Sequence, residues 1–340
     1  MKLAVICLVL PVAVGTAAAE TMRHVPPAEA EAGTAIELVA EASATTPTLV
    51  AHVRTSGATT FAPIELVRRD ELHWIAIVPA TSVVPPGLEY FIDAGGAPVF
   101  ASPESPHTVS VRLTDEAERR GRDMLRSNAR RSRIHVMGEW VDYGTRTMGT
   151  QQLPDHYYRL DGDFAYRLWA YPLEELRVGY TRLIGETAST ACPTGSTTCE
   201  AGFKVGGWFE LGLAPIEGIR FDGRMMVMAT GNGFGIGGRG EARLGERDAS
   251  HVAIGVESIQ DIGTSGFFRL GWGTVPTFPM TATVEITNLP APDRSTGVRL
   301  YYDLAHDFGQ GVRVGVRVGY AARVQTVAGF TGGLGATVDF

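Results

Sequence analysis

Charged residues recur at alternate positions in several segments of the C-terminal two-thirds of the chain. Arg220, Asp222 and Arg224 form one such set. Because alternate residues of a β-strand point to the same face, these side chains would stand in a row about 7 Å apart. On an enclosed face such a row either lines a narrow, ion-selective passage or forms salt bridges that fill and close the interior.

The same alternation assigns a large set of charged side chains to one face of these segments. The cations are Arg159, Arg167, Arg177, Lys204, Arg220, Arg224, Arg239, Arg243, Arg269, Arg299, Arg313 and Arg317, and the anions are Glu139, Asp161, Asp163, Glu210, Asp222, Glu241, Glu257, Glu285, Asp303 and Asp339. Twelve cations against ten anions are nearly balanced, which favours paired charges in a closed interior. If the interior is open, the two extra cations predict a modest preference for anions.

No arrangement of residues predicts an enzyme, a metal centre or a cofactor site. A literal G-x-G-x-x-G at Gly235, Gly237 and Gly240 is not followed by a helical apolar pattern, which a dinucleotide site requires. The chain contains no G-x-S-x-G, and its eight histidines show no spacing of two or four residues that would suit a metal. The neighbouring Asp155 and His156 fit ordinary loop polarity better than a protease site.

Residues 1–19 have the pattern of a secretory signal peptide. Lys2 precedes an apolar run, and Ala17-x-Ala19 provides a small-residue cleavage site. Removal of this segment leaves two cysteines, Cys192 and Cys199, in a polar stretch. Because an exported chain meets an oxidising compartment, we predict that these cysteines form a disulfide and not a metal or redox pair.

The composition narrows the class of protein. Of the 340 residues, 41 are glycine, which excludes a helical bundle because an interior glycine costs a helix about 1 kcal/mol. A charged fraction of 20% and a hydrophobic fraction of 44% argue against a disordered chain. A formal net charge of −7 makes nucleic acid an unexpected partner.

Residues 35–113 predict a small all-β domain after a polar lead-in at residues 20–34. Short segments of alternating polarity are separated by turn residues, which is the pattern of a β-sandwich. The run VPPGLEYFIDA at residues 84–94 resembles the turn and penultimate strand of immunoglobulin-like and fibronectin type III domains. The resemblance implies that the Tyr90 hydroxyl bonds back to the chain.

Residues 114–131 predict an Arg-rich linker helix. Thr114 can cap its first turn, in which acidic residues precede the basic ones, as the helix dipole prefers. Seven arginines fall between Arg119 and Arg133. They belong either to a solvated helix that joins two domains or to a basic collar that meets anionic head groups or a partner.

Residues 132–340 contain twelve segments that alternate in polarity over about 10–13 residues each. They are centred on Val136, Phe164, Val178, Phe209, Met225, Gly240, Ile254, Leu270, Val284, Leu300, Val316 and Leu334. Eleven residues of a strand span about 36 Å, and a tilt of about 40° reduces this to roughly the thickness of a hydrocarbon core. One face of each segment is apolar with interspersed glycine, and the other face carries the charges described above.

This part of the chain resembles the outer-membrane β-barrel proteins of Gram-negative bacteria. The most specific mark is the last segment, in which apolar residues alternate from Phe330 to a terminal Phe340. That ending resembles the C-terminal signal read by the barrel-assembly machinery, so the resemblance implies this machinery and outer-membrane lipid as partners.

The expected architecture is all-β: an immunoglobulin-like sandwich at residues 35–113, a linker helix at 114–131 and a twelve-stranded antiparallel transmembrane barrel at 132–340. An even number of strands returns both barrel ends to one side, which the resemblance places in the periplasm. There the sandwich would meet a periplasmic protein or the cell wall. We predict a structural, anchoring role with a salt-bridged lumen. The alternative is a narrow, weakly anion-preferring channel or small-solute transport protein.

Overall fold

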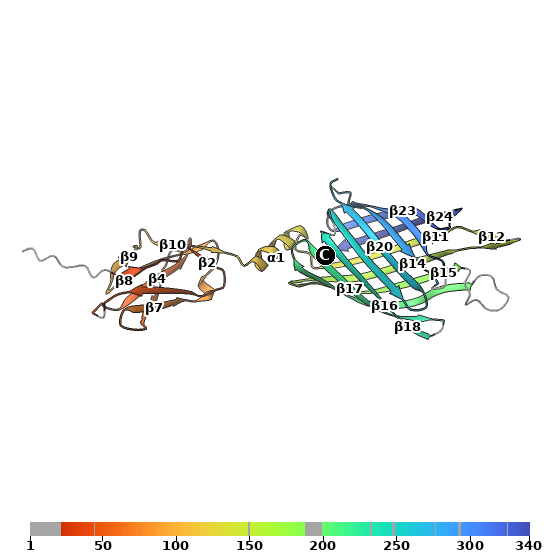
Figure 1. The fold of residues 1–340 in the computed structure, drawn as a ribbon. Coiled ribbons are helices and arrows are strands. Elements are labelled where there is room, and N and C mark those ends of the chain that lie inside the picture. Colours follow the sequence, from red (N-terminus) through yellow and green to blue (C-terminus); the bar gives the residue numbers. More distant parts are fainter. Residues whose placement is uncertain are drawn as a thin grey trace, which may run out of the picture. The chain divides into compact units, whose positions relative to one another are not determined.

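The computed structural model describes residues 22–43, 45–148, 150–187, 199–231, 233–246, 249–275, 277–291, 294–324 and 326–340, with side chains at all of these except 146–148, 151 and 199. The chain divides into two compact units, Met1–Glu118 and Arg119–Phe340, which are treated separately below (Figure 1). The predicted signal peptide at residues 1–19 and Cys192 lie outside the described residues, as does the side chain of Cys199. In the described part of the chain, no helix is both long enough and apolar enough to cross a membrane.

The N-terminal unit consists of two β-sheets. Its strands are β1 (Arg23–His24), β2 (Glu29–Glu31), β3 (Ile36–Glu41), β4 (Leu49–Thr55), β5 (Ala62–Glu65), β6 (Val67–Arg68), β7 (His73–Val78), β8 (Gly87–Ala94), β9 (Ala97–Phe100) and β10 (His107–Arg112), with a short 3-10 helix at Ala80–Ser82. One sheet has the order β1-β3-β7-β6, and the other has the order β2-β10-β8-β4-β5 with β9 beside β8. The polar lead-in therefore contributes two short strands, because its backbone pairs with β3 and β10.

Both sheets supply side chains to one apolar core. Leu38 and Val78 come from the first sheet, and Leu49, Leu88 and Tyr90 come from the second. The immunoglobulin-like character of this unit stays a prediction. The fully buried Tyr90 hydroxyl lies 2.6 Å from the His24 ring nitrogen Nε2, so its partner is a side chain and not the backbone. Burial raises the pKa of Tyr90 and lowers that of His24, which keeps both groups uncharged near neutral pH.

The C-terminal unit contains a closed barrel of twelve antiparallel strands. They are β11 (Ser132–Asp142), β14 (His156–Ala170), β15 (Leu173–Thr187), β16 (Cys199–Ile216), β17 (Ile219–Thr230), β18 (Gly233–Gly245), β19 (His251–Ile259), β20 (Gly263–Trp272), β21 (Met280–Thr287), β22 (Gly297–Asp307), β23 (Val312–Val324) and β24 (Val327–Asp339). Each predicted segment centre lies in its own strand, so the predicted strand number and antiparallel order are confirmed. A hairpin of β12 (Arg146–Met148) and β13 (Gln151–Leu153) lies in the β11–β14 connection.

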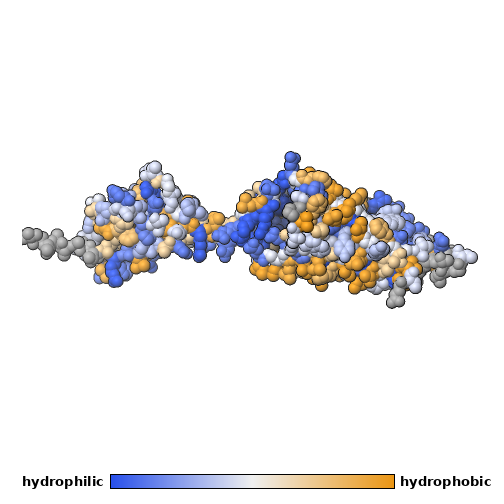
Figure 2. Space-filling model, turned by 90° about the horizontal axis from the view of Figure 1, so that it is seen from above, coloured by the Kyte–Doolittle hydropathy of each residue, from blue (hydrophilic) through white to orange (hydrophobic). Residues whose placement is uncertain are grey.

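The outer surface of the barrel is apolar. Residues such as Phe209, Val227, Ile254 and Leu300 are exposed on it, whereas their neighbours in sequence face inward. Figure 2 shows apolar residues in orange over much of the visible face of the barrel and hydrophilic residues in blue concentrated at one of its ends. Soluble proteins rarely expose so much contiguous apolar surface, and a hydrocarbon environment removes the cost of exposing it to water.

Phe340 extends the strand pairing that closes the barrel. The backbone groups of Phe340 and Ser132 exchange two hydrogen bonds of 2.9 Å, which continue the pairing of β24 with β11. The Phe340 side chain itself is exposed on the outside. Phe340 therefore contributes to closure through its backbone, as one pair beside the nine that join β24 to β11.

We expect Phe340→Asp to reduce the amount of folded barrel severalfold in cells, because the change replaces the aromatic ring that follows β24, which is 57% exposed, with a charge. Heat-modifiable mobility on gels measures the folded fraction. Phe340→Tyr, which keeps the ring, is the control and should fold like the wild type. A normal folded yield for Phe340→Asp would contradict an assembly role for this residue.

Candidate functional site

The interior of the barrel has two distinct ends. The helix end is the one at which Tyr171 joins β14 to β15 and at which α1 (Asp115–Arg126) ends. There Arg119 donates to the Ala214 carbonyl and lies 3.7 Å above the Tyr171 ring, and Arg126 pairs with Glu246 at 2.6 Å. We call the opposite end, which carries the β11–β14 and β21–β22 connections, the loop end.

The helix α1, which reaches the helix end of the barrel, is capped as predicted. Thr114 Oγ1 accepts a hydrogen bond from the Ala117 backbone at 3.1 Å. Burial and a hydrogen bond to Asp123 raise the pKa of Tyr171, so its hydroxyl stays protonated and donates to that carboxylate. Predicted collar arginines on α1 thus bind the barrel: Arg119, Arg122 through Glu217 at 2.9 Å, and Arg126. Beyond the helix, Arg131 lies 5.0 Å from the centre of the Trp169 ring, and Arg133 belongs to β11 and pairs with Asp339.

With one exception, described below, the structure places the predicted lumen charges inside the barrel, on the walls of two adjacent cavities. Arg159, Asp222, Arg224, Arg239, Glu241, Arg243, Arg313 and Arg317 line the central one, and Arg167, Arg220, Arg243 and Arg313 line the one at the helix end. The cavities have volumes of about 390 and 400 Å³ and share part of their lining. The interior therefore contains space that is lined by charge.

Salt bridges tie neighbouring strands together near the helix end. Asp222 accepts hydrogen bonds from Arg220 at 2.7 Å and from Arg243 at 2.6 Å. Arg220 also reaches Glu175 on β15 at 3.0 Å. All four groups are buried, and each charge has an opposite charge within hydrogen-bond distance, which offsets its loss of hydration.

Other ion pairs join strands that are distant in the barrel. Arg159 on β14 makes two hydrogen bonds of 2.6 and 3.1 Å to Glu257 on β19. Glu139 on β11 accepts from Arg299 at 2.9 Å and from Arg317 at 2.6 Å. The Arg159–Glu257 pair joins strands that are five positions apart in the barrel, whereas Glu139 reaches strands two and three positions away. These contacts narrow the lumen without filling it.

One predicted lumen residue, Lys204, lies outside. The pairing of β15 with β16 shifts register between Thr181 and Leu183, which places an extra residue in β16. As a result Phe203 points inward and is 2% exposed, whereas the Lys204 side chain is 72% exposed. Alternation counted from the segment centre Phe209 would place Phe203 on the outer face, and the bulge reverses this because it shifts the alternation by one residue.

Aromatic side chains hold several lumen arginines in place, a feature that the charge pattern did not predict. The guanidinium of Arg224 lies 3.5 Å from the centre of the Trp208 ring, and that of Arg317 lies 4.3 Å from the Tyr301 ring. Arg239 and Arg269 lie 4.8 and 5.0 Å from the Phe267 ring. Such contacts orient the guanidinium groups toward the cavity.

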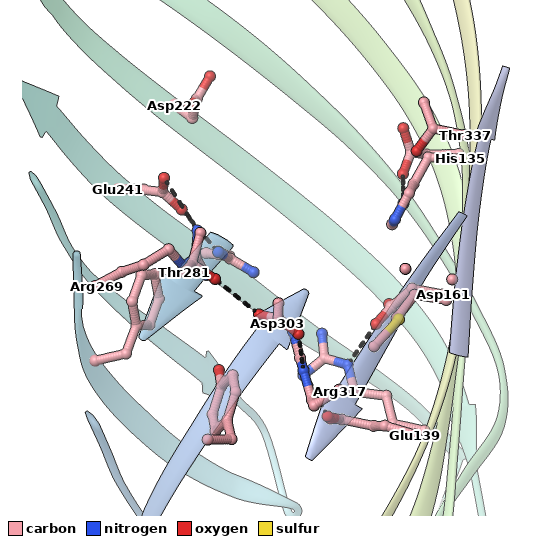
Figure 3. A pocket seen from close by; sticks show the side chains of 18 of the residues that line it. His135, Glu139, Asp161, Asp222, Glu241, Arg269, Thr281, Asp303, Arg317 and Thr337 are labelled. Atoms are coloured by element: carbon pink, nitrogen blue, oxygen red, sulfur yellow. Dashed lines mark hydrogen bonds and ion pairs between the residues drawn. The ribbon is translucent and has the colours of Figure 1, made fainter. Parts of the chain in front are cut away.

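These arginines and aromatic rings lie on the wall of the central cavity. In Figure 3, Arg269 lies near Glu241 on one wall, and Thr281, Asp303 and Arg317 form a chain of contacts on another. His135 bonds Asp163 at 3.1 Å on the far side. Within the described residues, no group of three or more His, Cys, Asp or Glu side chains is arranged to hold a metal ion.

The loop end of the lumen is narrowed by apolar side chains. Val141, Tyr157, Leu183, Phe203, Trp208, Met226, Met228, Ile259 and Leu289 belong to one buried cluster. Leu289 comes from the β21–β22 connection, so this connection folds into the barrel mouth. We call residues 288–291 the closing segment.

A buried ion-pair cluster holds the closing segment in place. Asp155 accepts hydrogen bonds from Arg323 at 2.6 Å and from Arg294 at 2.9 Å. Arg323 also donates to the Leu289 and Ser295 carbonyls, which lie in or next to the closing segment. Sequence reasoning treated Asp155 as loop polarity, and only its partners, which are more than 130 residues away, show its role.

Comparison with known proteins finds similarity in fold. No described protein family and no curated protein matches the chain. Among solved structures, an outer membrane channel from Pseudomonas putida F1 is 10% identical, with 62% of this chain and 96% of that chain covered and a TM-score of 0.46. The β domain of the Bordetella autotransporter BrkA is 12% identical (62% and 100% covered, TM-score 0.41), and the KdgM porin is 11% identical (61% and 99% covered, TM-score 0.40).

Proposed function

We propose that the protein is a bacterial outer-membrane channel for small hydrophilic solutes. The observation that carries this proposal is the pair of adjoining charged cavities, of about 390 and 400 Å³, inside a barrel with an apolar exterior. A hydrated polar interior admits small solutes, and the paired charges that line it limit their size. In the described part of the chain, no observation supports the purely structural, anchoring role that the sequence suggested first.

The loop end is assigned to the outside of the cell and the helix end to the periplasm. The longer connections lie at the loop end, as is usual for the extracellular side of such barrels. Both ends of the barrel chain, Ser132 and Phe340, lie together at the helix end. The N-terminal unit is then periplasmic, and protease added to intact cells should spare residues 35–113.

Single-channel recording of the full-length protein in planar bilayers tests the proposed function. We expect small conductance steps, because the closing segment and the salt bridges leave only a narrow path. The channel proposal would be wrong, and an anchoring role favoured, if neither the wild type nor a variant with a loosened closing segment conducts. Asp155→Ala, which is discussed below, is such a variant. The N-terminal unit should have no influence on the size of the steps.

A further inference from the structure

The charges that face the central cavity differ in their exposure from one part of the wall to another. On the wall formed by β17–β20, the carboxylates of Asp222, Glu241 and Glu257 are 5, 7 and 4% exposed. The side chains of Arg239 and Arg269 on the same wall are 22 and 23% exposed. The guanidinium groups of Arg239 and Arg269 are therefore more accessible than the carboxylates of the same wall.

Three arginines of this wall share a single carboxylate. Glu241 alone is approached by Arg239 at 2.7 Å, by Arg243 at 3.4 Å and by Arg269 at 3.7 Å. Within the described residues, Arg269 has one ion pair, which is this contact with Glu241. Its nitrogen-to-oxygen distance of 3.7 Å is longer than a hydrogen bond. The Arg269 guanidinium, which lies on the cavity wall, thus has N–H donors that this more distant carboxylate does not engage in a hydrogen bond.

The position of these two guanidinium groups is set before any solute arrives. Both lie within about 5 Å of the centre of the Phe267 ring, which attracts cations through its π-electrons. Phe267 and Arg269 are alternate residues on β20 and so share its inner face. A solute that binds here does not need to order flexible arginine side chains, which reduces the entropic cost of binding.

We infer that Arg239 and Arg269 form a binding site for the carboxylate or phosphate group of a small solute. Guanidinium groups bind both anions through paired N–H donors with matching geometry. Glu241 is shared among three arginines and cannot accept hydrogen bonds from all of them. A bound oxyanion would accept hydrogen bonds from the guanidinium groups that Glu241 leaves without one. This inference rests on the proposed function only in that solutes must reach the lumen, and it names their class: small organic or inorganic oxyanions.

The test compares Arg269→Gln, Arg269→Lys and Lys204→Gln in the full-length protein. Arg269→Gln removes the charge but keeps a polar side chain, and Arg269→Lys keeps the charge without the paired donors. Lys204→Gln removes one cation from the exposed outer surface and leaves the lumen unchanged. Reversal potentials are measured in salt gradients of potassium chloride, potassium acetate and potassium phosphate.

For the wild type we expect oxyanions to be more permeant than potassium. Arg269→Gln should lower this preference about fivefold, which corresponds to ~1 kcal/mol. Arg269→Lys should have a smaller effect, and Lys204→Gln should have none. A difference between acetate and phosphate would identify which oxyanion the site prefers. Conductance with the same ion preference in all four proteins would overturn the inference and leave the proposed function intact.

A second measurement does not depend on conduction. Thermal unfolding in detergent is followed with acetate or phosphate replacing chloride at constant ionic strength. Binding to the folded state should raise the midpoint for the wild type and Lys204→Gln but not for Arg269→Gln. If this difference appears in a protein that does not conduct, the binding site is supported and the proposed channel function is wrong. If all the proteins respond equally, the site is overturned whatever the conductance.

Discussion

Replacing Asp155 by alanine is expected to open the loop end of the lumen and raise the conductance, or the fraction of time open, at least tenfold. The carboxylate is the common acceptor for Arg323 and Arg294, and Arg323 binds the backbone of the closing segment. Removing one partner of a buried ion pair costs about 3–5 kcal/mol, because the remaining charge stays desolvated. Even ~3 kcal/mol shifts a two-state equilibrium roughly a hundredfold.

Single-channel recording measures the effect, with Asp261→Asn as the control. Asp261 is an exposed acid in the β19–β20 connection at the same end of the barrel, and asparagine tolerates its positive φ of 59°. The control should conduct like the wild type. If Asp155→Ala folds and its conductance is unchanged, the closing segment does not limit passage through the barrel.

Replacing Arg299 by methionine is expected to lower the free energy of unfolding by about 3–5 kcal/mol. Arg299 is 2% exposed and donates to Glu139 at 2.9 Å, to Glu285 at 3.2 Å and to the Tyr157 hydroxyl at 3.0 Å. Methionine fills similar space but leaves two buried carboxylates without this cation. The heat-modifiable gel shift and thermal melts in detergent measure the loss.

Two further variants separate charge pairing from packing. Lys204→Met removes a cation from an exposed position and should change stability by less than about 0.5 kcal/mol. Arg299→Met combined with Glu139→Gln should cost less than the sum of the single changes, because the second change removes one of the orphaned charges. Additive costs would show that the two residues are not coupled through their ion pair.

The strand order of the barrel and the inward face of most strands were predictable from the sequence. Alternation with a period of two is a local property, so residues such as Asp222 and Arg317 could be assigned to the lumen without knowledge of their partners. The same local argument failed at Phe203 and Lys204. A bulge adds one residue, and from that point the alternation that marks the lumen is reversed.

What the sequence determined by itself is therefore the polarity of each strand: an apolar face for a lipid surrounding and a charged face for an interior. Only the tertiary structure decided which charges meet, because closure and stagger of the barrel bring together residues as distant in the chain as Arg159 and Glu257. The role of Asp155 and the exposure of Arg269 over Glu241 arise in the same way. The role of Asp155 depends on connections that fold inward, and the exposure of Arg269 depends on how deeply its neighbours are buried. Neither property produces a periodic pattern in the sequence.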